Sequence, residues 1–375
     1  MSTYPEVPGA SKSSKAQEAN HVPSSPPAGY LDSLPGYEGT SFEEDTGQIS
    51  PPPYELIYPE VFPMRPPIQS HALTEQEARE AFVKFSQSHC CYGEGAAKNC
   101  VISDIQNTSA YHYCLETFAE GRKTNWKHQP YEGEPIPIFV TPPPGPWEIP
   151  VTDFNYFQDG KRRLVIPETT VVKECHACEG RGECKCKQCS GWGKIQCANC
   201  EGRGHKGADG GPQQCTTCEG YGKKVCPSCS GKDRLPCHTC KSRKKLKYYI
   251  ELEVTWKTFK NHHVVEQSDL PKHLITGVTG NVIFQEELPQ IAAISNFPDK
   301  EVNSGSADVL AKQLEEVTKT HRIIRQRHTL SVVPVSQINY QWKGNRKYFF
   351  VYGTEKDAYD PDYPQKCCCG VCTVL

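Results

Sequence analysis

Apolar and polar side chains alternate most regularly over residues 246–256. Every second position there is large and apolar, namely Leu246, Tyr248, Ile250, Leu252, Val254 and Trp256, and polar residues stand between them. A period of two is typical of a β-strand with one buried face. The same reasoning predicts strands at residues 101–118, 164–172 and 281–285. Residues 330–342 and 347–352 are expected to form a hairpin, with its turn at 343–345.

Two stretches show helical spacing instead. Thr74 and Glu77 fit a capping box, and Ala78, Ala81, Phe82 and Phe85 follow on one helical face. A second helix is expected at residues 307–320, capped by Ser306 and lined by Leu310, Leu314 and Val317. Many strands with a few helices predict an α+β, β-rich domain.

Six Cys-x-x-Cys pairs lie between the two halves of this domain. Their first cysteines are 11, 11, 18, 11 and 11 residues apart, so the spacing is the same from either end. A long hairpin would place the first pair beside the sixth, the second beside the fifth and the third beside the fourth. Pairing of neighbours would also give three groups of four, but the palindromic spacing favours nesting.

Each group of four thiolates is the ligand set of a closed, structural zinc site. Three zinc ions are therefore expected. The ligands by nested site are Cys175, Cys178, Cys237 and Cys240; Cys186, Cys189, Cys226 and Cys229; and Cys197, Cys200, Cys215 and Cys218.

Glycines follow the cysteine pairs in the pattern Cys-x-x-Cys-x-Gly-x-Gly. Glycine accepts a positive φ, which lets the backbone turn and aim N–H groups at the second sulfur. The first four pairs keep both glycines, but the fifth has Asp233 at the second position, and the sixth has Ser242 and Lys244. The outermost site therefore has the weakest support in the sequence.

The cysteines also allow two other interpretations. A disulfide framework is typical of secreted proteins, and residues 1–17 have no apolar signal core. A thiol–disulfide oxidoreductase could use an exposed Cys-x-x-Cys or Cys184, the cysteine of this region outside the pairs. Redox motifs do not require an eleven-residue repeat with trailing glycines, so zinc is favoured.

The repeat resembles the cysteine-rich domain of DnaJ-type co-chaperones, in which four repeats bind two zinc ions by nested pairing. This chain differs in having six repeats, and it contains no His-Pro-Asp tripeptide of a J domain. Residues 73–353 as a whole are similar to the Ssu-two homologue family, which carries a DnaJ-like zinc region inside an otherwise unrelated domain. The resemblance implies a non-enzymatic, intracellular binding protein.

Composition sets the domain limits. Residues 1–69 hold 13 of the 31 prolines and no cysteine, and are expected to be disordered. The α+β domain is expected to consist of two parts, residues 70–173 and 245–356. Residues 174–244 are expected to be inserted between them as a long zinc-binding hairpin arm. Residues 357–375 are expected to be a flexible tail.

The net charge of the whole chain is −2, which does not favour binding to nucleic acid. The absence of a long apolar run favours the cytosol or nucleus as the location.

Short motifs mark the two ends of the chain. Pro51, Pro52 and Tyr54 fit the Pro-Pro-x-Tyr ligand of WW domains. The last four residues fit a prenylation signal on Cys372, and Cys367, Cys368 and Cys369 are candidates for palmitoylation. Two lipids are needed for a stable tether, so membrane association is a second hypothesis.

The sequence thus predicts a zinc scaffold that binds unfolded clients or specific protein partners without catalysis. The alternatives are a lipid-anchored adaptor for WW-domain proteins and, less favoured, an oxidoreductase.

Overall fold

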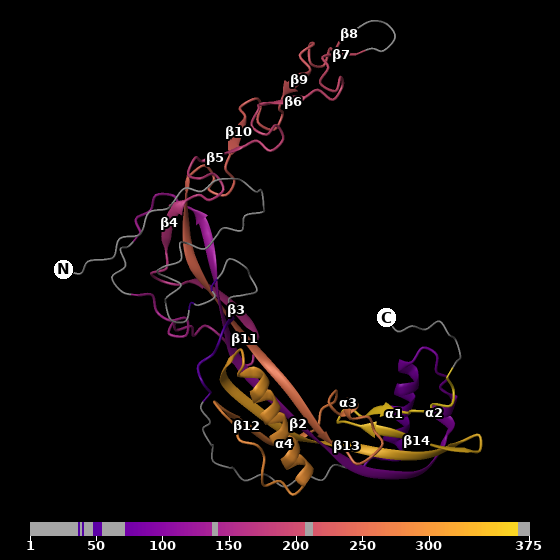
Figure 1. Cartoon of the computed structure of the whole chain (residues 1–375). Helices are drawn as coiled ribbons and strands as arrows, with labels where there is room; N and C mark the ends of the chain where they lie inside the picture. The colour runs from indigo at the N-terminus through magenta and orange to yellow at the C-terminus, as the bar shows by residue number, and fades with distance from the viewer. Residues whose placement is uncertain are drawn as a thin grey trace, which may run out of the picture. The chain divides into compact units, whose positions relative to one another are not determined.

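The structure is a computed structural model that describes Tyr37, Thr40 and residues 48–54, 72–136, 142–206 and 213–366. Strands dominate, with a few helices, as the sequence predicts (Figure 1). The chain divides into two compact units. The first includes Lys123–Ile149 and Arg163–Glu253; the second includes Gln48–Arg122, Pro150–Arg162 and Val254–Leu375.

A nine-stranded sheet contains all of the long strands. Its main order is β15-β14-β13-β2-β11-β3, while β1 pairs with β2, β12 with β13, and β4 with β11. The strands are β1 Gln48–Ile49, β2 Val101–Pro130, β3 Gly160–Val165, β4 Val171–Glu174, β11 Lys245–Val265, β12 Asn281–Leu288, β13 Arg322–Trp342, β14 Asn345–Tyr352 and β15 Asp357–Tyr359.

The alternation in β11 is confirmed residue by residue. All six apolar positions from Leu246 to Trp256 are buried, and the residues between them are partly exposed. The hairpin of β13 and β14 is also confirmed, with Trp342 opposite Asn345. Lys343 and Gly344 form its turn, and both have positive φ.

Helix α1, Glu75–Ser88, belongs to the second unit and packs on strand β14. Its capping box is confirmed: the Glu77 backbone N–H donates to the Thr74 hydroxyl, and the Glu77 carboxylate accepts from the Thr74 backbone N–H. Phe82 is fully buried, and its ring stacks on Phe349 of β14 with centroids 4.0 Å apart. The short helix α2, Gly95–Asn99, packs in the same core cluster as Phe82, whereas the short helix α3, Lys272–Ile275, packs in another cluster with Phe350.

Helix α4, Lys300–Val317, begins seven residues before the predicted start at residue 307, so the predicted Ser306 cap is wrong. The Asp299 side chain caps it by accepting from the Glu301 N–H at 2.8 Å. Ser306 is instead buried inside the helix, where its hydroxyl donates to the Ile294 carbonyl. Packing against the rest of the unit therefore outweighs the weak helix propensity of residues 303–306.

Two other boundaries differ from the prediction. The strand expected at 164–172 is broken into β3 and β4, because Pro167 has no N–H for the ladder and Glu168 takes a positive φ of 65°. The start of the predicted flexible tail is ordered up to Lys366: β15 pairs with β14, and Tyr363 is buried.

Part of the N-terminal segment that was expected to be disordered is also described. The buried Tyr37 hydroxyl donates to the Pro144 carbonyl at 2.5 Å, and β1 adds to β2. The rest of residues 1–69, apart from Thr40 and residues 50–54, lies outside the described residues.

Candidate metal centre

Three short antiparallel strand pairs follow one another along the cysteine region, which we define as residues 175–240 (Figure 1). These pairs are β5 Glu183–Lys185 with β10 Arg234–Pro236, β6 Lys194–Gln196 with β9 Lys223–Val225, and β7 His205–Lys206 with β8 Gln213–Gln214. Strands β4 and β11 pair at the two ends of the region. The outgoing and returning chain segments therefore lie side by side.

This pairing gathers the cysteines into three groups of four. The base group is Cys175, Cys178, Cys237 and Cys240; the middle group is Cys186, Cys189, Cys226 and Cys229; and the tip group is Cys197, Cys200, Cys215 and Cys218. All twelve side chains are buried. The grouping is the nested one, in which the first pair meets the sixth, and pairing of neighbours is not observed.

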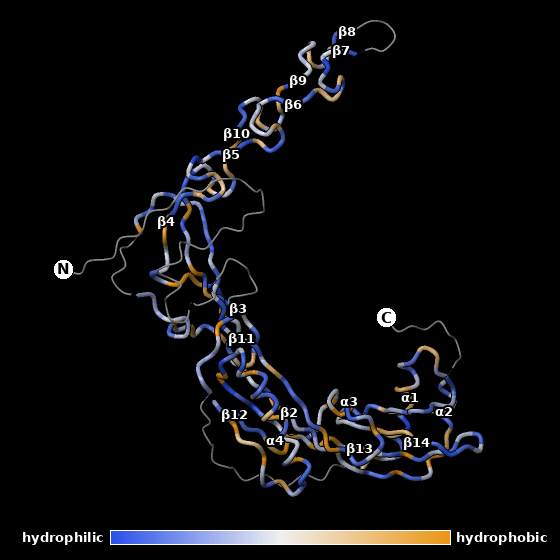
Figure 2. Tube along the Cα trace, in the orientation of Figure 1, coloured by the Kyte–Doolittle hydropathy of each residue, from blue (hydrophilic) through white to orange (hydrophobic). Residues whose placement is uncertain are grey.

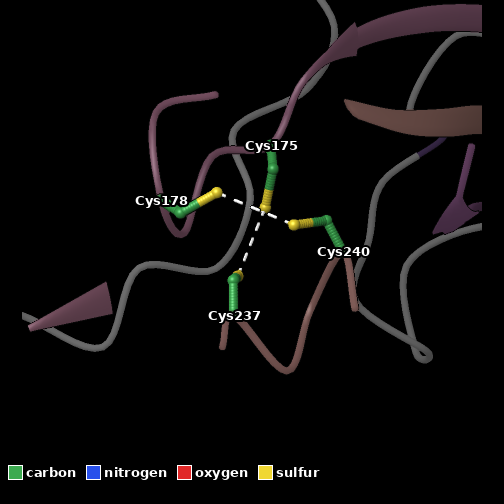
Figure 3. A group of neighbouring side chains, drawn as sticks. All are labelled: Cys175, Cys178, Cys237 and Cys240. Carbon is green, nitrogen blue, oxygen red and sulfur yellow. Dashed lines mark hydrogen bonds between the residues drawn. The ribbon is translucent and has the colours of Figure 1, made fainter. Parts of the chain in front are cut away.

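The sulfur positions within each group match a tetrahedral zinc site. Between the two halves of a group the Sγ–Sγ distances are 3.8 and 3.7 Å at the base, 3.7 and 3.7 Å in the middle, and 3.9 and 3.6 Å at the tip. Four sulfurs at about 2.3 Å from one zinc would be about 3.8 Å apart. Figure 3 shows the four base sulfurs converging on one point. A disulfide requires about 2.05 Å, so these contacts are not disulfides.

The backbone after each pair turns in the left-handed region to reach the sulfur. In the middle group Ser190, Gly191 and Gly193 have φ values of 50°, 81° and 69°. This turn lets the Gly193 N–H donate to the Cys189 Sγ at 3.2 Å. Equivalent bonds to the second cysteine of a pair are donated by Gly182 at 3.2 Å and by Gly204 and Gly222 at 3.3 Å. Each such N–H stabilises thiolate charge beside a metal.

The fifth pair forms the same turn without its second glycine, and the sixth pair forms it without either glycine. Asp233 has φ 62° and Lys244 has φ 69°, and their N–H groups bond to the sulfurs of Cys229 and Cys240. The base site, which has the weakest support in the sequence, is therefore formed like the other two. Left-handed backbone is uncommon for these residue types but accessible to them, and the ladder pairing holds it here.

One thiol in each group has a lowered pKa. Burial raises the pKa of Cys189, but N–H donors, with Gly193 foremost, and neighbouring thiols outweigh it and bring the value to about 7. Against the same effect of burial, N–H groups and nearby thiols lower the pKa of Cys215 at the tip and of Cys237 at the base to about 6. Burial raises the pKa of a second thiol in each group, namely Cys229, Cys218 and Cys175. Zinc requires all four sulfurs as thiolates, so its binding would release protons from these thiols.

Apolar packing around the groups is small. Ile195 and Leu235 are the partly buried apolar residues packed against the middle cysteines. Figure 2 shows short hydrophilic and apolar segments alternating along this region. The residues present therefore fit a region whose fold depends on bound metal more than on a hydrophobic core.

Cys184 lies outside the three groups. Its Sγ contacts the Ala177 carbonyl oxygen at 3.4 Å, and burial together with nearby thiols, Cys237 first among them, raises its pKa to about 11. A thiol with a raised pKa is a poor nucleophile. This weakens the oxidoreductase interpretation for Cys184.

The other predicted site residues are placed only in part. Pro51 and Tyr54 are partly buried and Pro52 is exposed, in a segment without regular structure, and burial raises the pKa of Tyr54. The predicted lipidation residues Cys367, Cys368, Cys369 and Cys372 lie outside the described residues. In the part of the chain that the structure describes, no helix has the length and apolarity to cross a membrane.

Three groups of four buried thiols within a β-rich fold define a cysteine-rich protein built to bind metal. The chain is 41% identical to the Protein SSUH2 homolog of Danio rerio over 93% of its length and 96% of the relative's. It is 37% identical to the Protein SSUH2 homolog of Homo sapiens over 94% of its own length and 95% of the relative's. The chain is 39% identical to the Protein SSUH2 homolog of Mus musculus over 80% of its own length and 90% of the relative's. No family model matches the chain.

The chain therefore belongs to the SSUH2 homolog family, which confirms the resemblance seen in the sequence.

Proposed function

We propose that this protein is a non-enzymatic scaffold in which three zinc ions hold the cysteine region as a hairpin arm inserted in the β-rich domain. The arm presents a surface that binds polypeptides, either unfolded clients or specific partners, without J-domain activity. The reducing cytosol or nucleus is the proposed location, because free thiolates are required for zinc.

The observation that supports this proposal most directly is the closure of the three groups. Each has four buried sulfurs at tetrahedral separations. A zinc ion with four protein ligands keeps no position for a water or a substrate, which favours a structural role over catalysis. Since metal binding free energy becomes folding free energy, the zinc ions would supply the rigidity that a binding surface needs.

The zinc content and the binding are tested on the full-length protein. We expect native mass spectrometry to find three zinc ions with every thiol reduced, and chelation to remove them. The zinc-loaded protein should suppress aggregation of a heat-denatured test protein, and the chelated protein should not. Loss of two-hydrogen masses without zinc would instead indicate disulfides. Zinc-independent suppression would remove the cysteine region from the function.

A lipid-anchored adaptor is the alternative, with Cys372 as the lipid acceptor and Pro51–Tyr54 as a ligand for a WW domain. It is supported by the sequence motifs. Comparing membrane fractions of the wild type and Cys372→Ser tests it, and equal fractions would exclude a prenyl tether.

A further inference from the structure

Three large apolar side chains are exposed around the β6–β9 pair. Trp192 is 82% exposed, Tyr221 81% and Val225 60%. Among the described residues four large apolar side chains are at least 60% exposed, and three of them lie in or directly before the strands of this one short pair. Such a cluster is typical of a surface that contacts another molecule, and aromatic side chains carry much of the energy in such contacts.

The pairing register relates the two aromatic residues by a local twofold axis. Lys194 lies opposite Val225, and Gln196 lies opposite Lys223, so each β6 position corresponds to the β9 position 29 residues later. Trp192 thereby corresponds to Tyr221.

The backbone φ angles of corresponding residues agree with this twofold symmetry. Gly191 and Gly220 have φ values of 81° and 82°, and Gly193 and Gly222 have 69° and 70°. The twofold axis of an antiparallel pair is perpendicular to the sheet, so equivalent residues stay on one face. Both rings therefore belong to the same face, at opposite ends of the pair. At about 3.3 Å per residue, six strand positions separate them by at most about 20 Å.

Positive charge is concentrated around the middle zinc site. The two segments 186–196 and 223–236 carry six cations and one carboxylate, Asp233; the cations are Lys187, Lys194, Lys223, Lys224, Lys232 and Arg234. Four thiolates with one zinc contribute about −2, which leaves about +3. The whole region has ten cations and six carboxylates, and three zinc sites bring it to about −2. The base and tip together therefore carry about −5.

The β6–β9 ladder also has open edges. It is a two-stranded sheet, so each strand pairs with one neighbour and keeps a row of backbone donors and acceptors on its other side. An extended polypeptide can add to such an edge and place alternate side chains on one face.

Resting on the function proposed above, we propose that this face binds an extended, acidic polypeptide segment with alternating apolar residues. The segment adds as a strand to an edge of the β6–β9 pair and packs its apolar side chains on Trp192 and Val225. Its carboxylates then lie on the opposite face, which is the face of Lys224, in the positive field of the six cations. Single-stranded nucleic acid would use the rings and cations, but it would use neither the open edge nor the exposed valine, and the flanking sites repel phosphate.

The test uses zinc-loaded, full-length protein and three fluorescein-labelled probes followed by anisotropy. The probes are a peptide of about 12 residues alternating Glu and Val, the matching Lys–Val peptide, and an oligothymidylate of similar length. The Glu–Val peptide should bind, and more weakly at high salt. Trp192→Ala should weaken it about tenfold or more, while native mass spectrometry still finds three zinc ions.

Val225→Thr provides a second variant, and Val282→Thr on β12 is its control, because Val282 is also exposed, at 53%. Val225→Thr should weaken binding several-fold and Val282→Thr should not. Failure of the Glu–Val peptide to bind, equal binding by Trp192→Ala, or a preference for the oligonucleotide would each overturn the inference. Zinc-dependent suppression of aggregation would survive any of these results, so the proposed function is tested separately.

Discussion

Replacement of Cys226 by serine removes one ligand from the middle zinc site. Cys226 is fully buried, with its Sγ 3.7 Å from that of Cys186. A serine hydroxyl stays protonated at neutral pH and cannot replace a thiolate. Cys184→Ser is the matched control, because it makes the same atomic change close by but outside the three groups.

The expected size of the effect follows from the ligand count. A structural zinc site is worth about 10–16 kcal/mol, so one of four thiolates accounts for about 3 kcal/mol, or at least about 100-fold in zinc affinity. Burial cannot compensate, because Ile195 and Leu235 are the apolar residues packed on the middle cysteines and are only partly buried. Each contributes at most about 1.5–3 kcal/mol. Zinc loss should therefore open β5–β10 and β6–β9.

Native mass spectrometry during a chelator titration measures the affinity, and hydrogen exchange locates the opening. Cys226→Ser should hold two zinc ions where the wild type holds three, and its amides in 183–196 and 223–236 should exchange faster. Amides of β2 and β13 in the second unit should be unchanged. Cys184→Ser should keep three ions. Retention of three tightly bound ions by Cys226→Ser, or loss of one by Cys184→Ser, would refute the nested assignment.

Three further predictions concern positions with a defined physical role. Lys244→Gly relieves a left-handed residue and should leave zinc affinity at the base site equal or slightly higher in the same chelator titration, where a loss would contradict the turn geometry. Gln313→Leu should cost about 2 kcal/mol in urea unfolding, because the buried Gln313 amide donates to the Phe259 carbonyl at 3.1 Å and accepts from Thr117. Burial lowers the pKa of His328 to about 4; the unfolded state protonates below about 6.5 while the folded state does not, so stability is lost as pH falls from about 6.5 to 4, by at most about 1.4 kcal/mol per pH unit. Melting of His328→Gln at pH 7 and pH 5 should show a smaller loss than the wild type, and an equal loss would assign the pH dependence to other groups.

The features that the sequence predicts well are those that repeat. The buried face of β11 repeats every second residue, so one-sided burial follows from alternation alone. The cysteine pairs repeat with a palindromic spacing, and a single hairpin pairs such a pattern only by nesting. In both cases the tertiary structure uses every copy of the repeat, so local pattern and global fold agree.

The features that it misses depend on which of several local signals the packed structure uses. The start of α4 is set by Asp299 and by bonds from Ser306 to Ile294, which no helical periodicity reveals. The sixth cysteine pair shows that the turn can also form where the glycine pattern is absent. Ser242 and Lys244 adopt φ values of 63° and 69° that their residue types disfavour, because ladder pairing and sulfur contacts compensate.

The exposed aromatic residues follow from the way this region is stabilised. In a domain held by a hydrophobic core, a tryptophan as large as Trp192 would normally be buried, and its removal would cost about 3–5 kcal/mol. Here four-sulfur sites replace the core, so Trp192 and Tyr221 stay at the surface, on turns whose backbone the cysteines and glycines already fix. Trp192→Ala should therefore leave zinc stoichiometry and hydrogen exchange of β6 and β9 unchanged while it weakens the Glu–Val peptide. Faster exchange in β6 without any change in peptide binding would show that the ring stabilises the fold and does not bind a ligand.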